Sequence, residues 1–305
     1  MFCMVVTPMH DDGSIDEDGF RAHLRRMVAG GVGVYLGSGG SGEGHAMTLE
    51  ELGRLYVIGV EECRGKVPIY CNPPESRSAR EMLDKVRLGI DAGVEVVQLY
   101  QLDAGHGRVP VLTEQERYYR DLLEATDHPV ALSVHSAVGY LAPSSLVLRL
   151  CNDYPQIKLI NLHGPSMSYL VQLKDGLSPE VKLYVGMADI LSALPLGGWG
   201  AQATEPNQVP NLCRLIVDRF WAGDIAGAGE AYATVLRIND IIGWGRQVSA
   251  DGPKAGMKAL GLDVGPPRPP RVAVDDATIE KMRIAIEALN IADIEQKASA
   301  EHVLA

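Results

Sequence analysis

The stretch VGVYLGSGGSGEGHAMTLEELGRLYVIGVEEC, residues 32–63, contains the pattern that decides the fold. An apolar run at 32–36 precedes a loop of glycine and serine. Residues 48–51 (TLEE) then have the spacing of a capping box at the start of a helix. A short, continuously apolar run is typical of a parallel strand that is covered on both faces. The segment therefore predicts one strand, one loop and one helix, in that order.

The same unit recurs along the first 222 residues. Strands are expected at 1–7, 32–36, 67–71, 94–99, 130–134, 157–162, 181–185 and 200–203. Helices are expected at 16–29, 48–63, 76–92, 113–126, 143–154, 166–176, 187–196 and 209–222. Eight successive strand–helix units favour a closed (β/α)8 TIM barrel, with a doubly wound open sheet as the alternative.

After residue 223 the strand pattern stops. Helical periodicity is present at 223–243, at 254–260 and at 276–291, and the prolines between the last two segments exclude helix there. We therefore expect a barrel at 1–223 and a C-terminal helical region at 224–305 that packs on it. The tail beyond Gln296 is expected to fray.

Composition excludes several classes of protein. There are 28 Lys and Arg against 39 Asp and Glu, a net charge of −11, which argues against a nucleic-acid surface. No apolar run approaches the roughly 18 residues that span a bilayer, and the N-terminus lacks the basic flank of a signal peptide. The five cysteines form no CxxC pair, so neither a disulfide framework nor a zinc ribbon is indicated. A cytoplasmic protein that binds neither nucleic acid nor membrane is expected.

The glycine-rich loop at 37–43 (GSGGSGE) contains a G-x-G-x-x-G spacing. A dinucleotide-binding loop would open directly into its helix, whereas here the helix has its own cap at Thr48. Small residues at the carboxyl end of a barrel strand expose backbone N–H groups to an anion. The loop therefore predicts an anion site at Gly40 and Ser41, with a merely flexible turn as the alternative.

Several motifs along the chain resemble one family of (β/α)8 lyases. They are residues 6–9 (VTPM) with 12–16 (DGSID), 39–43 (GGSGE) with 46–51 (AMTLEE), and 262–272 (LDVGPPRPPRV). The chain is similar in these motifs to the dihydrodipicolinate synthase and N-acetylneuraminate lyase superfamily. The resemblance implies aldolase or lyase chemistry on a small 2-oxo acid, a homo-oligomer (dimer or tetramer) and a carboxylate bound by the Gly40–Ser41 loop.

The resemblance also implies a Schiff-base lysine on the sixth strand and a proton-relay tyrosine on the fifth, and the sequence departs from both. Alignment without gaps places Asn161 at the lysine position and Ser133 at the tyrosine position. Lys158, three residues before Asn161, would point to the other face of the strand. No other lysine lies at the carboxyl end of an expected strand. The site therefore has no lysine amine that could form an imine.

Other polar residues follow the expected strands. His135 is two residues beyond Ser133, and His163 is two beyond Asn161, so the two imidazoles are expected to lie near each other. Imidazole suits general acid–base work near neutral pH. The alternatives are a metal held by histidine and carboxylate, and hydrogen-bonding loop residues without chemistry. Asn161 and Ser133 are interpreted either as groups that orient a substrate or as neutral fillers.

Three carboxylates complete the candidate set. Asp103 follows the fourth strand, Glu205 follows the eighth, and both are candidate substrate-binding residues together with Glu43. For Glu43 a role in bracing its loop is favoured. The preferred hypothesis is a lyase-like or hydratase-like enzyme that acts on a small carboxylate without a Schiff base, a metal or a cofactor. The alternatives are a non-catalytic ligand-binding or regulatory homologue and a metal-assisted aldolase.

Overall fold

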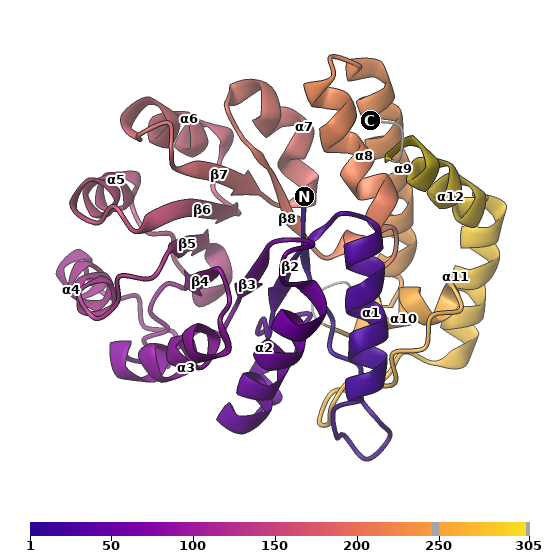
Figure 1. Cartoon of the computed structure of the whole chain (residues 1–305), viewed down its shortest axis with the longest axis horizontal. Helices are drawn as coiled ribbons and strands as arrows, with labels where there is room; N and C mark the ends of the chain where they lie inside the picture. The colour runs from indigo at the N-terminus through magenta and orange to yellow at the C-terminus, as the bar shows by residue number, and fades with distance from the viewer. Residues whose placement is uncertain (246–249, 303–305) are drawn as a thin grey trace. The chain divides into compact units, whose positions relative to one another are not determined.

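The computed structural model describes residues 1–245 and 250–302. Its strands are β1 (Phe2–Met4), β2 (Gly33–Leu36), β3 (Ile69–Cys71), β4 (Val96–Leu99), β5 (Val130–His135), β6 (Ile157–His163), β7 (Lys182–Val185) and β8 (Gly200–Ala203). They are hydrogen-bonded in chain order into a closed parallel barrel, which confirms the predicted (β/α)8 TIM barrel (Figure 1).

The chain groups into two compact units. Unit 1 comprises residues 1–69 and the chain from Ala203 onward, and unit 2 comprises residues 70–202. The helices of unit 1 are α1 (Glu17–Ala29), α2 (Leu49–Cys63), α8 (Pro210–Trp221), α9 (Ile225–Gly243), α10 (Asp251–Ala259), α11 (Asp276–Ala288) and α12 (Ile291–His302). The helices of unit 2 are α3 (Ala79–Ala92), α4 (Leu112–Leu123), α5 (Ser144–Asp153), α6 (Met167–Gly176) and α7 (Ile190–Ala193).

The capping box at the start of α2 is present as predicted. Thr48 Oγ1 accepts the backbone N–H of Glu51 at 3.2 Å, and Glu51 Oε2 accepts that of Thr48 at 2.9 Å. Each bond satisfies an N–H group that has no partner within the helix. The box therefore fixes where the chain turns from the glycine-rich loop into α2.

Several predicted helices differ from the structure in their bounds, and for two of them the cause is clear. Helix α4 begins at Leu112 rather than Thr113, because Glu114 accepts the backbone N–H of Val111 at 2.9 Å and so closes the first turn earlier. The helix expected at 187–196 is α-helical only over α7. The residues on either side form 3-10 turns, and Pro195, which has no N–H to donate, lies in the second of them.

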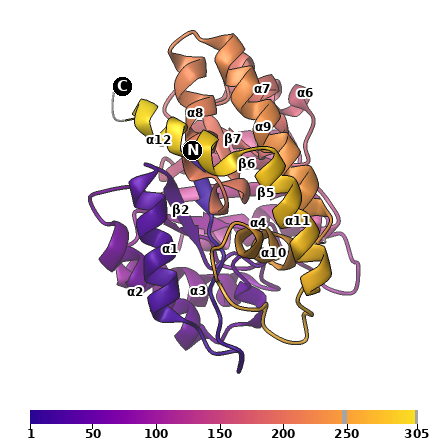
Figure 2. The same ribbon diagram turned by 90° about the vertical axis from the view of Figure 1, so that its right-hand side faces the viewer.

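The C-terminal helices pack on the rest of unit 1. Helix α9 packs along α8, α10 contacts α11, and Figure 2 shows α11 running beside α9. The expected fraying beyond Gln296 is wrong as far as His302, because α12 packs on α8. Glu295 accepts the backbone N–H of Leu212 at 2.9 Å and so anchors α12 to the start of α8. The expected boundary at 223/224 lies between α8 and α9 and stays a prediction as a domain limit.

Strands β5 and β6 position the residues of interest in unit 2. In β6, Lys158 is exposed whereas Asn161 is buried, which agrees with their expected placement on opposite faces. The polar Ser133 in β5 is also buried. A buried polar side chain needs a hydrogen-bond partner or a ligand, so these positions mark a polar interior within an otherwise apolar pair of strands.

Candidate functional site

Four buried amide side chains form a connected row in unit 2. Asn72 follows β3, Gln98 lies in β4, Asn161 in β6 and Gln202 in β8, and none is more than 1% exposed. Gln98 Nε2 donates to Asn72 Oδ1 at 2.7 Å. Gln98 Oε1 accepts from Asn161 Nδ2 and, at 3.5 Å, from Gln202 Nε2. Because an amide both donates and accepts, such a row can be satisfied without a buried charge.

The strand register brings the four candidate catalytic residues together in two pairs. Ser133 is paired with Asn161, and His135 is paired with His163, in the parallel ladder of β5 and β6. Successive residues of a strand point to opposite faces, so residues two apart share a face. The two imidazoles therefore follow Ser133 and Asn161 on the same side of the two strands.

His163 has one nitrogen bound within the unit. Its Nε2 lies 3.2 Å from Gln202 Oε1, and because a carbonyl oxygen only accepts, this nitrogen carries the proton. In the neutral ring, Nδ1 then keeps its lone pair. Nδ1 faces Gly186, where an added Cβ would lie 3.2 Å away. Burial lowers the pKa of His163, while Gln202 and the charge of Asp189 act in the opposite direction.

His135 is held on several sides. Its Nε2 lies 3.2 Å from Glu75 Oε1, and its Nδ1 accepts the backbone N–H of Ala137 at 3.3 Å. The ring stands edge-on to Tyr100, with 4.8 Å between the ring centroids. Burial lowers the pKa of His135, and the negative charge of Glu75 partly offsets this. Both imidazoles are therefore largely neutral at pH 7.

Sequence reasoning missed several residues of this cluster. They are Asn72, Glu75, Gln98, Tyr100 and Gln202. Gln98 and Gln202 interrupt strands that are otherwise apolar, and the other three follow β3 or β4 within a few residues. These residues could have been found from the sequence, because a polar residue inside a short apolar run, or just past its carboxyl end, indicates a polar site at the end of a barrel strand.

The glycine-rich loop of unit 1 is partly open. Gly40 is exposed, whereas Ser41 is buried. The Ser41 hydroxyl donates to the carbonyl of Met4 at 3.1 Å, so its proton is used inside the protein. Arg271 donates to the carbonyls of Gly40 and Gly39 at 3.3 and 3.4 Å. A cationic group therefore lies at the loop where an anion is expected, and the anion site itself stays a prediction.

Glu43 is buried at the end of this loop, where its backbone has a left-handed φ of 59°. Its carboxylate lies 2.5 Å from Lys254 Nζ and 3.7 Å from Arg271 Nη1, and it accepts the backbone N–H of Arg268 at 2.7 Å. These contacts join the loop to α10 and to the segment that follows it. They support the bracing role that was favoured for Glu43, while a role in substrate binding stays untested.

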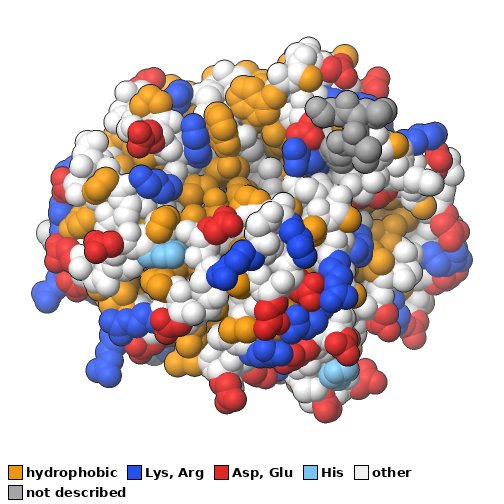
Figure 3. Space-filling view, in the orientation of Figure 1, with side chains coloured by type: hydrophobic (Ala, Val, Ile, Leu, Met, Phe, Trp, Pro, Cys, Tyr) orange, Lys and Arg blue, Asp and Glu red, His pale blue; other side chains and the backbone are white. Residues whose placement is uncertain are grey.

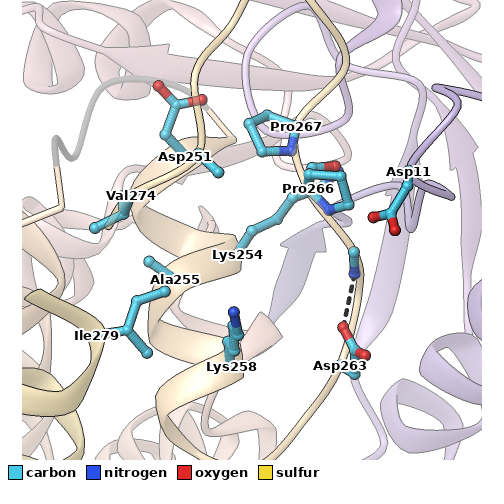
Figure 4. A pocket seen from close by; sticks show the side chains of 12 residues that line it. Asp11, Asp251, Lys254, Ala255, Lys258, Asp263, Pro266, Pro267, Val274 and Ile279 are labelled. Atoms are coloured by element: carbon cyan, nitrogen blue, oxygen red, sulfur yellow. Dashed lines mark hydrogen bonds between the residues drawn. The ribbon is translucent and has the colours of Figure 1, made fainter. Parts of the chain in front are cut away.

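Lys254 borders a pocket of about 240 Å³ in unit 1. Figure 4 shows its side chain extending from α10 toward Pro266, whose carbonyl accepts from Nζ at 2.9 Å. Burial lowers the pKa of Lys254, and the charge of Glu43 raises it. Asp251 and Asp263 also line the pocket, which therefore has mixed charge.

The other two candidate carboxylates have local partners. Asp103 accepts the backbone N–H of Gly105 at 2.9 Å, which is a turn contact two residues away. Glu205 is 8% exposed and accepts from Thr204 Oγ1 at 3.4 Å. Burial raises the pKa of Glu205 above its ordinary value. Their proposed contact with substrate stays a prediction.

Comparison with known proteins identifies the family. The model of the dihydrodipicolinate synthetase family matches residues 1–289. The chain belongs to the dihydrodipicolinate synthetase family. The 4-hydroxy-tetrahydrodipicolinate synthase of Methanopyrus kandleri is 24% identical over 294 residues, covering 94% of this chain and 95% of that protein. The synthase of Thermus thermophilus is 26% identical over 298 residues, with 94% and 95% covered.

Solved structures of this family share the fold. The dihydrodipicolinate synthase of Cyanidioschyzon merolae, with lysine bound, has a TM-score of 0.87 at 18% identity, and the match covers 95% of this chain and 97% of that one. A prophage protein of E. coli K12 from the same family, in complex with pyruvate, has a TM-score of 0.86 at 20% identity, with 95% and 98% covered. At these identities the match shows the fold alone.

Three general features bear on function. Within residues 1–245 and 250–302, no three His, Cys, Asp or Glu side chains are grouped to hold a metal ion. No helix in the same ranges combines the length and apolarity needed to cross a membrane. On the face drawn in Figure 3, acidic and basic side chains are interspersed over the described residues rather than gathered into a basic patch.

Proposed function

We propose that this protein is a lyase that acts on a small carboxylate and breaks a carbon–carbon or carbon–oxygen bond without a Schiff base. The pair of imidazoles on β5 and β6 carries the proposal, because it stands beside Asn161, the residue aligned with the family's lysine. The lone pair of an amide nitrogen is delocalised, and Asn161 Nδ2 is already bound to Gln98. The site therefore offers proton transfer and hydrogen bonds in place of a nucleophilic amine.

His163 is the general base in this proposal. Its Nδ1 carries the lone pair that takes a proton from the substrate carbon next to a carboxylate or carbonyl group. A lowered pKa keeps the ring neutral, and so able to accept a proton, at pH 7. Asn161 and Ser133 supply hydrogen bonds that orient the substrate's carbonyl or hydroxyl oxygen.

An enzyme is favoured over a non-catalytic binding protein because the side chains of the site are polar and are joined to one another by hydrogen bonds. The amide row and both histidines are buried or half-buried and linked to fixed partners. Holding polar groups in the interior costs free energy, so a buried network of this size supports a functional role. A binding role alone would not require two adjacent imidazoles.

Two experiments test the proposal. Borohydride reduction in the presence of pyruvate, followed by mass spectrometry, is expected to show no adduct on any lysine; an adduct would refute the absence of a Schiff base. Small 2-oxo and hydroxy acids are then incubated in D2O, and loss of their carbon-bound protons is followed by NMR. His163→Gln is expected to slow this exchange on the order of 100-fold, whereas His10→Gln, an exposed histidine, leaves it unchanged.

A further inference from the structure

Glu75 and His135 form a close pair of a carboxylate and an imidazole in unit 2. Glu75 lies four residues beyond β3, and its Oε1 is 3.2 Å from His135 Nε2. The side chains are only 15% and 9% exposed. We propose that Glu75 is a further functional residue, which holds the His135 proton on Nε2, so that the pair places one negative charge beside His163 and stabilises its imidazolium form. This inference rests on the proposed lyase function.

The two ring nitrogens of His135 have different surroundings. Nδ1 accepts the backbone N–H of Ala137 and so carries no proton of its own. The proton of the neutral ring is therefore on Nε2. Nε2 is buried, and within the described ranges it makes no hydrogen bond of good geometry; its contact with the Glu75 carboxylate is one of charge. A buried N–H without a partner costs roughly 1–3 kcal/mol, so the carboxylate 3.2 Å away is the group that stabilises this tautomer.

The position of His135 is set by its neighbours. Its backbone N–H donates to Gln101 Oε1 at 2.7 Å, and Gln101 Nε2 donates in turn to the carbonyl of Tyr140 at 3.0 Å. The edge-on contact with Tyr100 limits rotation of the ring. The imidazole therefore cannot turn away from Glu75 without breaking several contacts.

The position of Glu75 is set by a buried lysine. Lys85 of α3 donates from Nζ to the carbonyls of Pro74 and Glu75, each at 3.4 Å, and to Ser76 Oγ at 3.0 Å. Its charge is balanced by Glu81 at 2.9 Å. A lysine that is nine-tenths buried and bound to three consecutive residues fixes the path of that segment. Lys85 is thus a positioning residue that directs the Glu75 carboxylate at His135.

The pair stabilises the charge that His163 gains during the reaction. In a dehydration, the substrate C–H bond breaks and His163 Nδ1 takes the proton. The electron pair forms the new C=C bond, the C–O bond breaks, and the departing hydroxide takes the proton back from His163 to form water. His163 is then neutral again, the pair of Glu75 and His135 has kept its own proton, and no further reactant is consumed.

Histidine NMR tests the pairing without any substrate. Long-range 15N correlation is expected to show His135 as the Nε2–H tautomer. The titratable groups that face His135 are Glu75 from the loop after β3, Tyr100 after β4 and His163 on β6. Glu75→Gln removes the charge that favours the imidazolium, so the pKa of His135 is expected to fall. The matched control Glu95→Gln removes an exposed carboxylate of unit 2 and is expected to leave it unchanged.

The outcomes separate this inference from the proposed function. An unchanged His135 pKa in Glu75→Gln, or an Nδ1–H tautomer in the parent, would overturn the pairing. Lys85→Met is expected to lower the His135 pKa and Lys85→Arg to retain it, which provides a second reading if Glu75→Gln fails to fold. If the NMR results hold and no acid exchanges its carbon-bound protons in D2O, the pair stands and the lyase proposal fails. If exchange occurs and Glu75→Gln leaves its rate and pH profile unchanged, the pair has no part in the reaction.

Discussion

His135 on β5 and His163 on β6 are direct partners in the parallel ladder, and burial lowers the pKa of both. The charge of a protonated His163 would lower the pKa of His135 further. Two adjacent imidazoles in a buried site therefore resist carrying positive charge together. The pair is suited to exchanging single protons near neutral pH rather than to binding an anion by charge.

The pH dependence of proton exchange follows from this relationship. His163 acts as a base only when neutral, and its pKa lies below the ordinary 6.5. Exchange of carbon-bound protons is therefore expected to stay level as the pH falls from 8 toward neutrality and to decline only below pH 6.5. Rates measured by NMR across this range provide the test, and a decline that begins above pH 7 would contradict His163 as the base.

His23 in unit 1 makes the protein sensitive to acid. It is 3% exposed, and burial lowers its pKa from 6.5 to about 4. Because the unfolded chain binds this proton more readily, stability is full above pH 6.5 and is lost as the pH falls toward 4. Between pH 7.5 and pH 5 the expected loss from this group is about 2 kcal/mol. Urea unfolding at these two pH values should show a loss of unfolding free energy that is larger in the parent than in His23→Gln by that amount. Equal losses in the two proteins would contradict the role of His23.

Asn207 links four groups of unit 1 and is fully buried. It accepts from the backbone N–H of Val6 at 3.0 Å and pairs with the ring of His23 at 2.8 Å; it donates to the carbonyls of Met4 and Thr204 at 2.9 and 2.7 Å. Asn207→Ala removes this partner from the Val6 N–H and from the His23 ring, whereas the two carbonyls keep other donors, and it is expected to lower the free energy of unfolding by about 3–5 kcal/mol. The exposed Asn152→Ala should cost less than about 0.5 kcal/mol. A cost of that small size for Asn207→Ala would show that water replaces its bonds.

Local patterns in the sequence were sufficient for the elements but not for the polar network. The period of two along a strand predicted that His135 lies on the same face as Ser133. The register of β5 and β6 then places His135 beside His163. The bond between Gln98 and Asn161 joins residues on β4 and β6, and no local pattern specifies it. Long-range contacts of this kind appear only when the barrel is closed.

The same limit applies to the charged groups. A lysine on a helix, such as Lys85, is usually solvated, and nothing near it in sequence shows that its amine turns under the segment after β3. The missed start of α4 has a smaller cause, because only the structure shows that the Glu114 side chain reaches back to the backbone N–H of Val111 and so begins the helix at Leu112. Boundaries of one or two residues are decided by such competing bonds.

The buried ion pair of Glu43 and Lys254 is expected to matter strongly for stability. The side chains are 0% and 3% exposed and their charged atoms are 2.5 Å apart. Removing one partner leaves the other charge buried, so Lys254→Met is expected to cost about 3–5 kcal/mol. Lys297→Met, which breaks an exposed pair with Asp293, is the matched control and should cost at most about 1 kcal/mol. In chemical denaturation, the double variant Glu43→Gln/Lys254→Met should lose less than the sum of the two single losses; additive losses would show that the two charges do not interact.

The open position in the glycine-rich loop permits a direct test of the expected anion site. An added Cβ at Gly40 meets no atom within 4 Å, so Gly40→Leu is compatible with the fold. Ser41 is a poorer choice, because its hydroxyl is bound to Met4 and its replacement would disturb the loop. The net charge of −11 opposes the approach of an anion, so the backbone donors and the nearby Arg271 must supply the attraction.

Gly40→Leu is therefore expected to weaken the binding of small carboxylates while unfolding remains unchanged. Each charge-assisted hydrogen bond contributes roughly 1.5–3 kcal/mol, so blocking one should raise Kd about tenfold or more. Gly229→Leu is the matched control, since Gly229 in α9 is also open to solvent and lies outside the loop. Calorimetric titration with 2-oxo and hydroxy acids measures both variants against the parent. If Gly40→Leu binds these acids as tightly as Gly229→Leu does, the carboxylate is held elsewhere, and the loop's glycines serve only its turn.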